Sequence, residues 1–356
     1  RYVVVAREDS DLVENTFTCR LATQTTMEDT SWIRPGQVIW EWWHHTSPYH
    51  VDFVVGRNQE TYKYYIDFAS RFGIEYVILD EGWSKSRQAD LFQVVPDIDL
   101  EELVKYAGER NVGIILWAGY YAFARDMEKV CKHYSAMGIK GFKIDFMDRD
   151  DQKMVDFHYK AAEMTAKYHL LVDFHGSYKP TGLNRTYPNV INFEGVHGLE
   201  QQKFADSSID QVTYDVTIPF IRQLAGPMDY TQGAMRNATK ENFSPVYSEP
   251  MSQGTRCRQL AQYVVFESPL NMLCDSPSNY MKEEECTKYI ATVPTVWDTT
   301  ISLAGEIGKY VAIARKSGED WYIGAMTNWD SRTIEIDFSF LEEGVYEVDI
   351  FEDGMN

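Results

Sequence analysis

The repeated alternation of short apolar runs with helical patterns restricts the fold of this chain more than any other sequence feature. The stretch VIWEWW (Val38–Trp43) reads as a strand, and the later TYKYYIDFASRFG has apolar residues at helical spacing and a helix stop at Gly73. Strand and helix patterns then alternate from about residue 37 to about residue 292. Such alternation predicts parallel βα units, and eight of them predict a (β/α)8 TIM barrel over residues 36–293.

Some elements of this barrel can be predicted in detail. Asp99 stands three residues before Glu102 and is expected to cap the helix that follows it. A long helix is expected from roughly Asp151 to Tyr168. The seventh strand is expected in FIRQLAG, residues 220–226, ahead of an irregular stretch and an eighth strand in LNMLCDSP.

The two ends of the chain have a different texture. After about Pro294, short β-rich runs alternate with turn signals such as Ser317-Gly318, which predicts a small antiparallel β domain over residues 294–356. Residues 1–35 read as strand and loop and are interpreted as a connector that leads into the barrel.

Composition excludes several classes of protein. The formal net charge of -20 argues against a nucleic-acid partner, because phosphate backbones need a basic surface. No apolar run reaches the roughly 20 residues that a membrane-spanning helix needs. The five cysteines show no CxxC spacing and are odd in number, so neither a disulfide framework nor a zinc site is expected.

The run GIKGFKIDFMDRDDQ is the first sign of chemistry. Side chains alternate along a strand, so Lys143 and Asp145 point to the same side of an otherwise apolar strand. In a TIM barrel the catalytic groups sit at the carboxyl ends of the strands. Other candidates follow predicted strands in the same way: Glu41, Trp43, Asp80, Trp83, Trp117, Asp173, His175, Glu194, Glu200 and Asp275.

Carboxylates mixed with tryptophans favour a sugar site, since aromatic faces pack on pyranose C–H groups and carboxylates bind hydroxyls. Glycoside hydrolysis generally uses two carboxyl groups beside the scissile bond. Asp145 is the preferred nucleophile, because Lys143 on the same strand face favours the ionised carboxylate. Either Glu194 or Glu200 could then be the acid.

Four long motifs carry a family resemblance: YVILDEGW, GIKGFKIDFMDRDDQ, HGSYKPTGLNRTYPNVINFEGVHGLE and LAGPMDYTQGAM. Together they resemble glycoside hydrolase family 97. The resemblance implies a large β-sandwich domain ahead of the barrel, so residues 1–35 are expected to connect to a missing upstream domain. It also implies a bacterial, periplasmic enzyme of carbohydrate metabolism.

Within that family, the resemblance favours the retaining α-galactosidase branch. The position of the base in inverting members looks like Gly176 here, while Asp145 stands where retaining members have their nucleophile. The resemblance implies that Glu200 is the acid/base and that Glu194 binds Ca2+ with Glu200 beside it. The expected substrate is an oligosaccharide or glycan with terminal α-galactose. The expected sugar-binding residues are Asp80, Trp83, Lys143, His175, Trp43 and Arg185.

Two other functions stay open at this point. One is an inverting α-glucosidase of the same family. The other is a barrel that binds sugar without catalysis, against which the pair of carboxyl groups at Asp145 and Glu200 argues.

Overall fold

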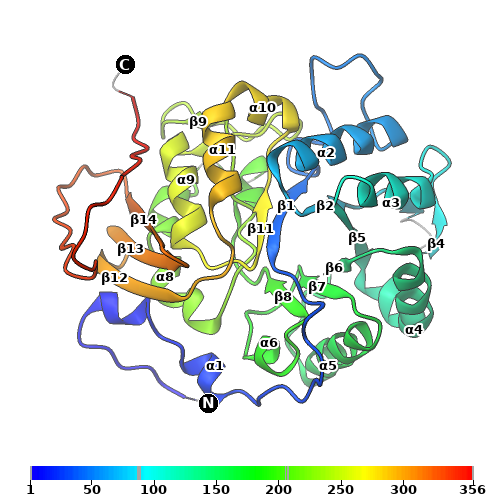
Figure 1. The fold of residues 1–356 in the computed structure, drawn as a ribbon, viewed down its shortest axis with the longest axis horizontal. Coiled ribbons are helices and arrows are strands. Elements are labelled where there is room, and N and C mark those ends of the chain that lie inside the picture. The colour runs from blue at the N-terminus through cyan, green and yellow to red at the C-terminus, as the bar shows by residue number, and fades with distance from the viewer. Residues whose placement is uncertain (1, 86–89, 205, 207, 355–356) are drawn as a thin grey trace.

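Seven parallel strands form the central sheet of the computed structural model, which describes residues 2–85, 90–204, 206 and 208–354. Their order is β11-β1-β2-β5-β6-β7-β8, as expected for successive βα units. The helices lie around the outside of these strands (Figure 1). The strands are β1 (Gly36–Trp40), β2 (Tyr76–Leu79), β5 (Gly113–Gly119), β6 (Gly141–Asp145), β7 (Leu171–Phe174), β8 (Val190–Phe193) and β11 (Leu270–Leu273).

The helices of the barrel begin and end close to the predicted residues. Gly73 ends α2 with a left-handed φ of 75°, and Asp99 accepts a hydrogen bond from the backbone N–H of Glu102 at the start of α3. Asp151 caps α5. These helices are α2 (Gln59–Phe72), α3 (Leu100–Gly108), α4 (Tyr120–Met137), α5 (Gln152–Lys167), α6 (Leu183–Thr186), α7 (Gln211–Asp215), α8 (Ile218–Ile221), α9 (Arg256–Val265), α10 (Pro277–Lys282) and α11 (Glu284–Thr292).

The predicted seventh strand at residues 220–226 is wrong. That segment lies in α8 and the 3-10 helix η4 (Gln223–Ala225), where Pro219 stands in the first turn of α8. The next residues bridge β8 and β11 without forming a regular strand. The N–H of Asp229 donates to the carbonyl oxygen of Phe193 at 2.7 Å, and the N–H of Cys274 donates to that of Gln232 at 3.1 Å. Among the described residues the barrel is therefore nearly closed, with an irregular segment in its seventh place.

An antiparallel sheet follows the barrel, as predicted. It consists of β12 (Thr299–Glu306), β13 (Tyr310–Ser317) and β14 (Asp320–Thr327), and it packs against α9 (Figure 1). Two short pairs complete the sheets: β3 (Ser84–Lys85) with β4 (Asp90–Val94), and β9 (Asn237–Ala238) with β10 (Ser252–Gln253).

The strand expected in the first 35 residues is absent from described residues 2–35, which contain the 3-10 helix η1 (Asp9–Leu12) and α1 (Phe17–Leu21). This segment contacts the C-terminal sheet, because Glu14 Oε1 accepts a hydrogen bond from the N–H of Ser302 at 2.6 Å. In the part of the chain that the structure describes, no helix is both long and apolar enough to cross a membrane.

Candidate active site

A buried ion pair forms the floor of the site at the carboxyl ends of β2 and β6. Lys143 Nζ lies 2.7 Å from Asp80 Oδ2, and the indole N–H of Trp40 donates to the same oxygen at 2.6 Å. Burial acts against the charge of Lys143, but the carboxyl groups of Asp80, Asp145 and Glu200 outweigh it and raise the pKa of this lysine above its usual value. The ammonium group therefore stands among three carboxyl groups, as the alternation along β6 predicts.

Asp145 ends β6 with both carboxylate oxygens engaged. The indole N–H of Trp117 donates to Oδ2 at 3.0 Å, and the backbone N–H of Phe146 donates to Oδ1 at 2.7 Å. Phe146 has a φ of 67°, which is uncommon for an aromatic residue and typical of strained functional sites. This turn and the indole fix the orientation of the Asp145 carboxylate.

Gly176, just after β7, packs against the end of β6. Its φ is 52°, and a Cβ there would lie 2.8 Å from the backbone nitrogen of Phe146 and 3.1 Å from Asp145 Oδ1. Its carbonyl oxygen also accepts a hydrogen bond from the N–H of Asp148 at 2.6 Å. Position 176 thus has no room for a side chain while Asp145 keeps this orientation.

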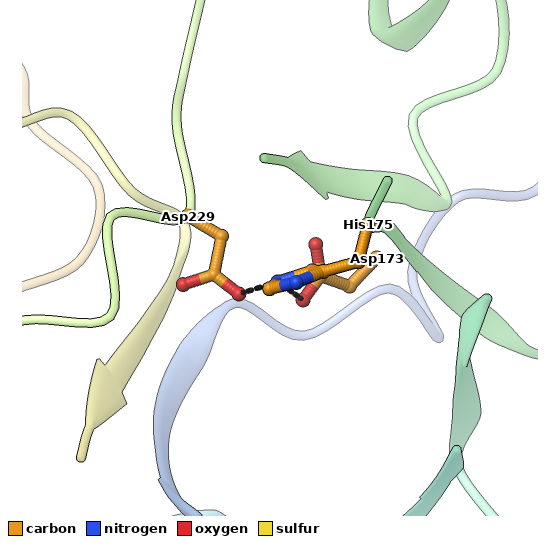
Figure 2. Close-up of side chains that lie close together, drawn as sticks. All are labelled: Asp173, His175 and Asp229. Atoms are coloured by element: carbon orange, nitrogen blue, oxygen red, sulfur yellow. Dashed lines mark hydrogen bonds and ion pairs between the residues drawn. The ribbon is translucent and has the colours of Figure 1, made fainter. Parts of the chain in front are cut away.

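A histidine lies between two aspartates at the end of β7 (Figure 2). His175 Nε2 lies 2.6 Å from Asp229 Oδ2 and 3.6 Å from Asp173 Oδ2. Burial and Lys143 act to lower the pKa of His175, but Glu194, Asp173 and Asp229 outweigh them and raise it well above the usual value. These carboxyl groups favour the protonated imidazole, whose Nδ1 lies 3.8 Å from Glu194 Oε1.

Glu200 stands on the 3-10 helix η3 (Leu199–Lys203), close to Glu194. Burial and the Glu194 carboxylate raise the pKa of Glu200 to about 8. Glu194 is held by the backbone N–H of Gly176, which donates to Oε2 at 2.7 Å. Glu200 is thus suited to carry a proton at neutral pH, as a general acid must.

The same corner could hold a cation. Ligand atoms of His175, Glu194 and Glu200 all lie within 4.8 Å of one another. Calcium prefers carboxylate and carbonyl oxygens, usually about six to eight of them, whereas imidazole suits transition metals. The two glutamates therefore fit part of a calcium site.

Three of the residues expected to bind sugar have other contacts in the fold. Trp83 is fully buried, and its indole N–H donates to the carbonyl oxygen of Trp117 at 2.9 Å. Trp43 is also fully buried in the core. Arg185 donates to the carbonyl oxygens of residues 19, 20 and 22, so it anchors the N-terminal segment. The sugar-binding roles of these three side chains stay predictions, whereas Asp80, Lys143 and His175 lie close to Asp145 and Glu200 in the structure.

Several residues of the site had no role assigned from the sequence. Trp117 was visible as a strand-end residue, and Asp229 lies within the motif LAGPMDYTQGAM, yet neither had an assigned partner. Trp40 ends β1, and Trp42 lies two residues further along in the loop that follows this strand. Lys203 was not a candidate either, because only the folded structure shows that its side chain is buried beside the site.

The comparisons with known proteins agree with this geometry. A family model described as "Glycoside hydrolase 97" matches residues 40–196, and one described as "Glycosyl-hydrolase 97 C-terminal, oligomerisation" matches residues 296–356. Together the two models match more than half of the chain.

Two curated relatives match almost the whole chain. A "Retaining alpha-galactosidase" of Bacteroides thetaiotaomicron is 63% identical over 100% of this chain and 54% of its own length. A "Probable retaining alpha-galactosidase" of Streptomyces bingchenggensis is 33% identical over 99% of this chain and 52% of its own length. The chain thus spans about half the length of these relatives.

A solved structure shows the same fold. It is a glycoside hydrolase family 97 enzyme from Pseudoalteromonas sp. strain K8 in complex with acarbose, with 30% sequence identity and a TM-score of 0.85. The match covers 95% of this chain and 57% of that one. The motifs, the barrel and these matches lead to one conclusion: the chain belongs to glycoside hydrolase family 97.

Proposed function

We propose that this chain is the catalytic part of a retaining α-galactosidase that removes terminal α-galactose from oligosaccharides or glycans. The crowding between position 176 and Asp145 carries the proposal. Because a Cβ at Gly176 would crowd Phe146 and Asp145, position 176 offers no carboxylate to activate water, whereas Asp145 is oriented at the end of β6. The names of the two curated relatives support the same activity.

The reaction takes two displacements. In the first, an Asp145 oxygen bonds to the anomeric carbon, the glycosidic C–O bond breaks, and Glu200 gives its proton to the departing oxygen. In the second, the Glu200 carboxylate takes a proton from water, the water oxygen bonds to the anomeric carbon, and Asp145 leaves. Two inversions give net retention, so the first product is α-galactose.

Lys143 and Asp80 have binding roles in this proposal. Both stand on the floor of the site, and their donor and acceptor groups can bind galactose hydroxyls. Lys143 also balances the charge of Asp145, since its ammonium interacts with that carboxylate. His175 fixes the position of Glu194 through its charge.

We further propose that Glu194 and Glu200 hold a Ca2+ ion, completed by water or by the expected upstream β-sandwich domain. When bound, the cation would supply positive charge beside the leaving-group oxygen.

NMR analysis of the product configuration tests the activity on the complete protein. An aryl α-galactoside should yield α-galactose before mutarotation. A β-sugar as the first product would support the inverting α-glucosidase instead. Sugar binding without turnover would support the non-catalytic barrel.

A further inference from the structure

Lys203 is a buried lysine at the edge of the site with an unusual environment. It is 1% exposed, and its Nζ lies 3.9 Å from the ring centre of Trp42 and 4.2 Å from that of Tyr247. The same ammonium donates to the carbonyl oxygen of Trp42. Lys203 therefore joins three segments: the loop after β1, helix η3, and the loop that carries Tyr247.

Three aromatic side chains form a wall around this lysine, which we call the aromatic wall (Trp42, Phe204 and Tyr247). Phe204 and Tyr247 meet the Trp42 ring edge-on, with ring centres 6.3 and 6.2 Å away. Phe204 is 52% exposed and Tyr247 is 49% exposed. Both half-exposed rings lie against Trp42, and Lys203 contacts the rings of Trp42 and Tyr247, so the two rings present apolar surface to solvent.

The aromatic wall is continuous with the active site. The Trp42 ring stacks on Trp40 at 5.4 Å, and Trp40 in turn donates to Asp80 on the floor. Phe204 directly follows η3, the helix that carries Glu200. Burial lowers the pKa of Lys203 to about 7, and the carboxyl groups of Asp80 and Glu200 act in the opposite direction, so both lie within electrostatic reach of this lysine. The wall therefore stands on the Glu200 side of the site.

That side is where a leaving group must lie. A general acid reaches the oxygen that departs, so the sugar attached through that oxygen sits beside the acid. Exposed aromatic rings suit the apolar C–H face of a pyranose, and they add specific geometry to the area they bury.

We propose that Phe204 and Tyr247, backed by Trp42, bind the first sugar of the leaving group, and that Lys203 is a positioning residue that holds this wall together. The proposal rests on the glycosidase function above. It adds a recognition site for the part of the substrate beyond galactose.

Two substrates separate this role from catalysis in the complete protein. An α-1,6-linked galactosyl-glucose disaccharide has a leaving-group sugar, whereas α-galactosyl fluoride has none. Phe204→Ala and Tyr247→Ala should each lower kcat/KM for the disaccharide about 5- to 20-fold, while kcat/KM for the fluoride stays within about twofold. Lys203→Met should lower kcat/KM for the disaccharide more than kcat/KM for the fluoride. Phe338→Ala is the matched control, because Phe338 is 55% exposed on the C-terminal part of the chain.

The outcomes are distinct. Equal losses on both substrates would overturn the aromatic wall as a leaving-group site, and so would unchanged disaccharide kinetics in both alanine variants. Failure of the wild-type protein to hydrolyse either substrate would overturn the glycosidase function, and the aromatic wall with it. A wild-type protein that hydrolyses only the fluoride would leave the glycosidase function standing and overturn the wall.

Discussion

Lys143 and Asp80 form an ion pair inside the barrel, with 2.7 Å between Nζ and Oδ2 and with both side chains almost fully buried. Lys143→Met leaves the Asp80 carboxylate buried without its counter-ion. Loss of one partner of such a pair typically costs about 3–5 kcal/mol. We expect the free energy of unfolding to fall by that order, measured by urea denaturation, and the activity to fall with it.

A surface pair provides the control. Lys240 lies 3.5 Å from Asp210, and its side chain is 59% exposed. Lys240→Met should change stability little, because exposed ion pairs contribute little. Equal destabilisation by the two substitutions would show that burial of the Lys143–Asp80 pair does not matter.

Gly176→Ala should impair catalysis more than folding. The new Cβ would press on the backbone nitrogen of Phe146 and on Asp145 Oδ1, and misplacing a catalytic group by about 1 Å can cost about 100-fold in rate. The left-handed backbone adds about 1–2 kcal/mol of strain. Steady-state kinetics and thermal unfolding measure the two effects.

Gly73→Ala isolates the strain. Gly73 also has a positive φ, but a Cβ there would meet no atom within 4 Å. This variant should lose similar stability and keep its activity. If Gly73→Ala lost as much activity as Gly176→Ala, crowding of Asp145 would not be the cause.

Asp145→Gly should lose several orders of magnitude in activity, because the covalent intermediate cannot form. Azide can enter the vacated space and attack an activated α-galactoside, which should give the β-galactosyl azide. In Glu200→Ala, azide attacks the intermediate on Asp145 and should give the α-azide. NMR of the isolated azides distinguishes them. An α-azide from Asp145→Gly would contradict the assignment of the nucleophile.

The pH profile should show Glu200 as a proton donor. Its pKa is raised to about 8, so kcat/KM for substrates with poor leaving groups should fall as the pH rises through about 8. Added Ca2+ should move this fall to lower pH, because a nearby cation favours the carboxylate. Glu200→Gln should remove the alkaline limb along with most of the activity. An alkaline limb that persists in Glu200→Gln would belong to another group.

Calcium should stabilise the folded protein if Glu194 and Glu200 hold it. At about 100 times its Kd, a ligand that binds only the folded state adds about 2.7 kcal/mol. Tm should therefore rise with added calcium, and Glu194→Gln should greatly reduce this rise. Glu249→Gln, at a glutamate whose side chain is 70% exposed, should retain it. An undiminished rise in Glu194→Gln would place the ion elsewhere.

The sequence was sufficient where local pattern and periodicity decide the structure. Caps such as Asp99 and Gly73 act within one turn of their helix, and alternation along β6 puts Lys143 beside Asp145 on one face. The sequence was insufficient where tertiary contacts decide which secondary structure a segment adopts. Phe220–Gly226 resembles a strand, yet it is helical, and irregular chain takes the seventh place of the barrel.

Burial and contacts between distant segments are the other features of the site that the sequence does not show. A strand-end tryptophan can face a ligand or the core, and Trp83 faces the core. Arg185 was read as a sugar ligand, but its partners lie about 165 residues away in sequence. Lys203 offers no local signal, since its aromatic partners come from two distant loops.

The contact between Gly176 and Asp145 also limits how such a barrel can change mechanism during evolution. Under the proposed mechanism, a base at position 176 would crowd the nucleophile at position 145, because its Cβ would lie 3.1 Å from Asp145 Oδ1. A lineage that gains a side chain at 176 first obstructs its nucleophile, and one that loses Asp145 first has neither group. A change from one mechanism to the other would therefore pass through an ancestor of low activity, unless both positions changed together. A single substitution at either position would not be neutral.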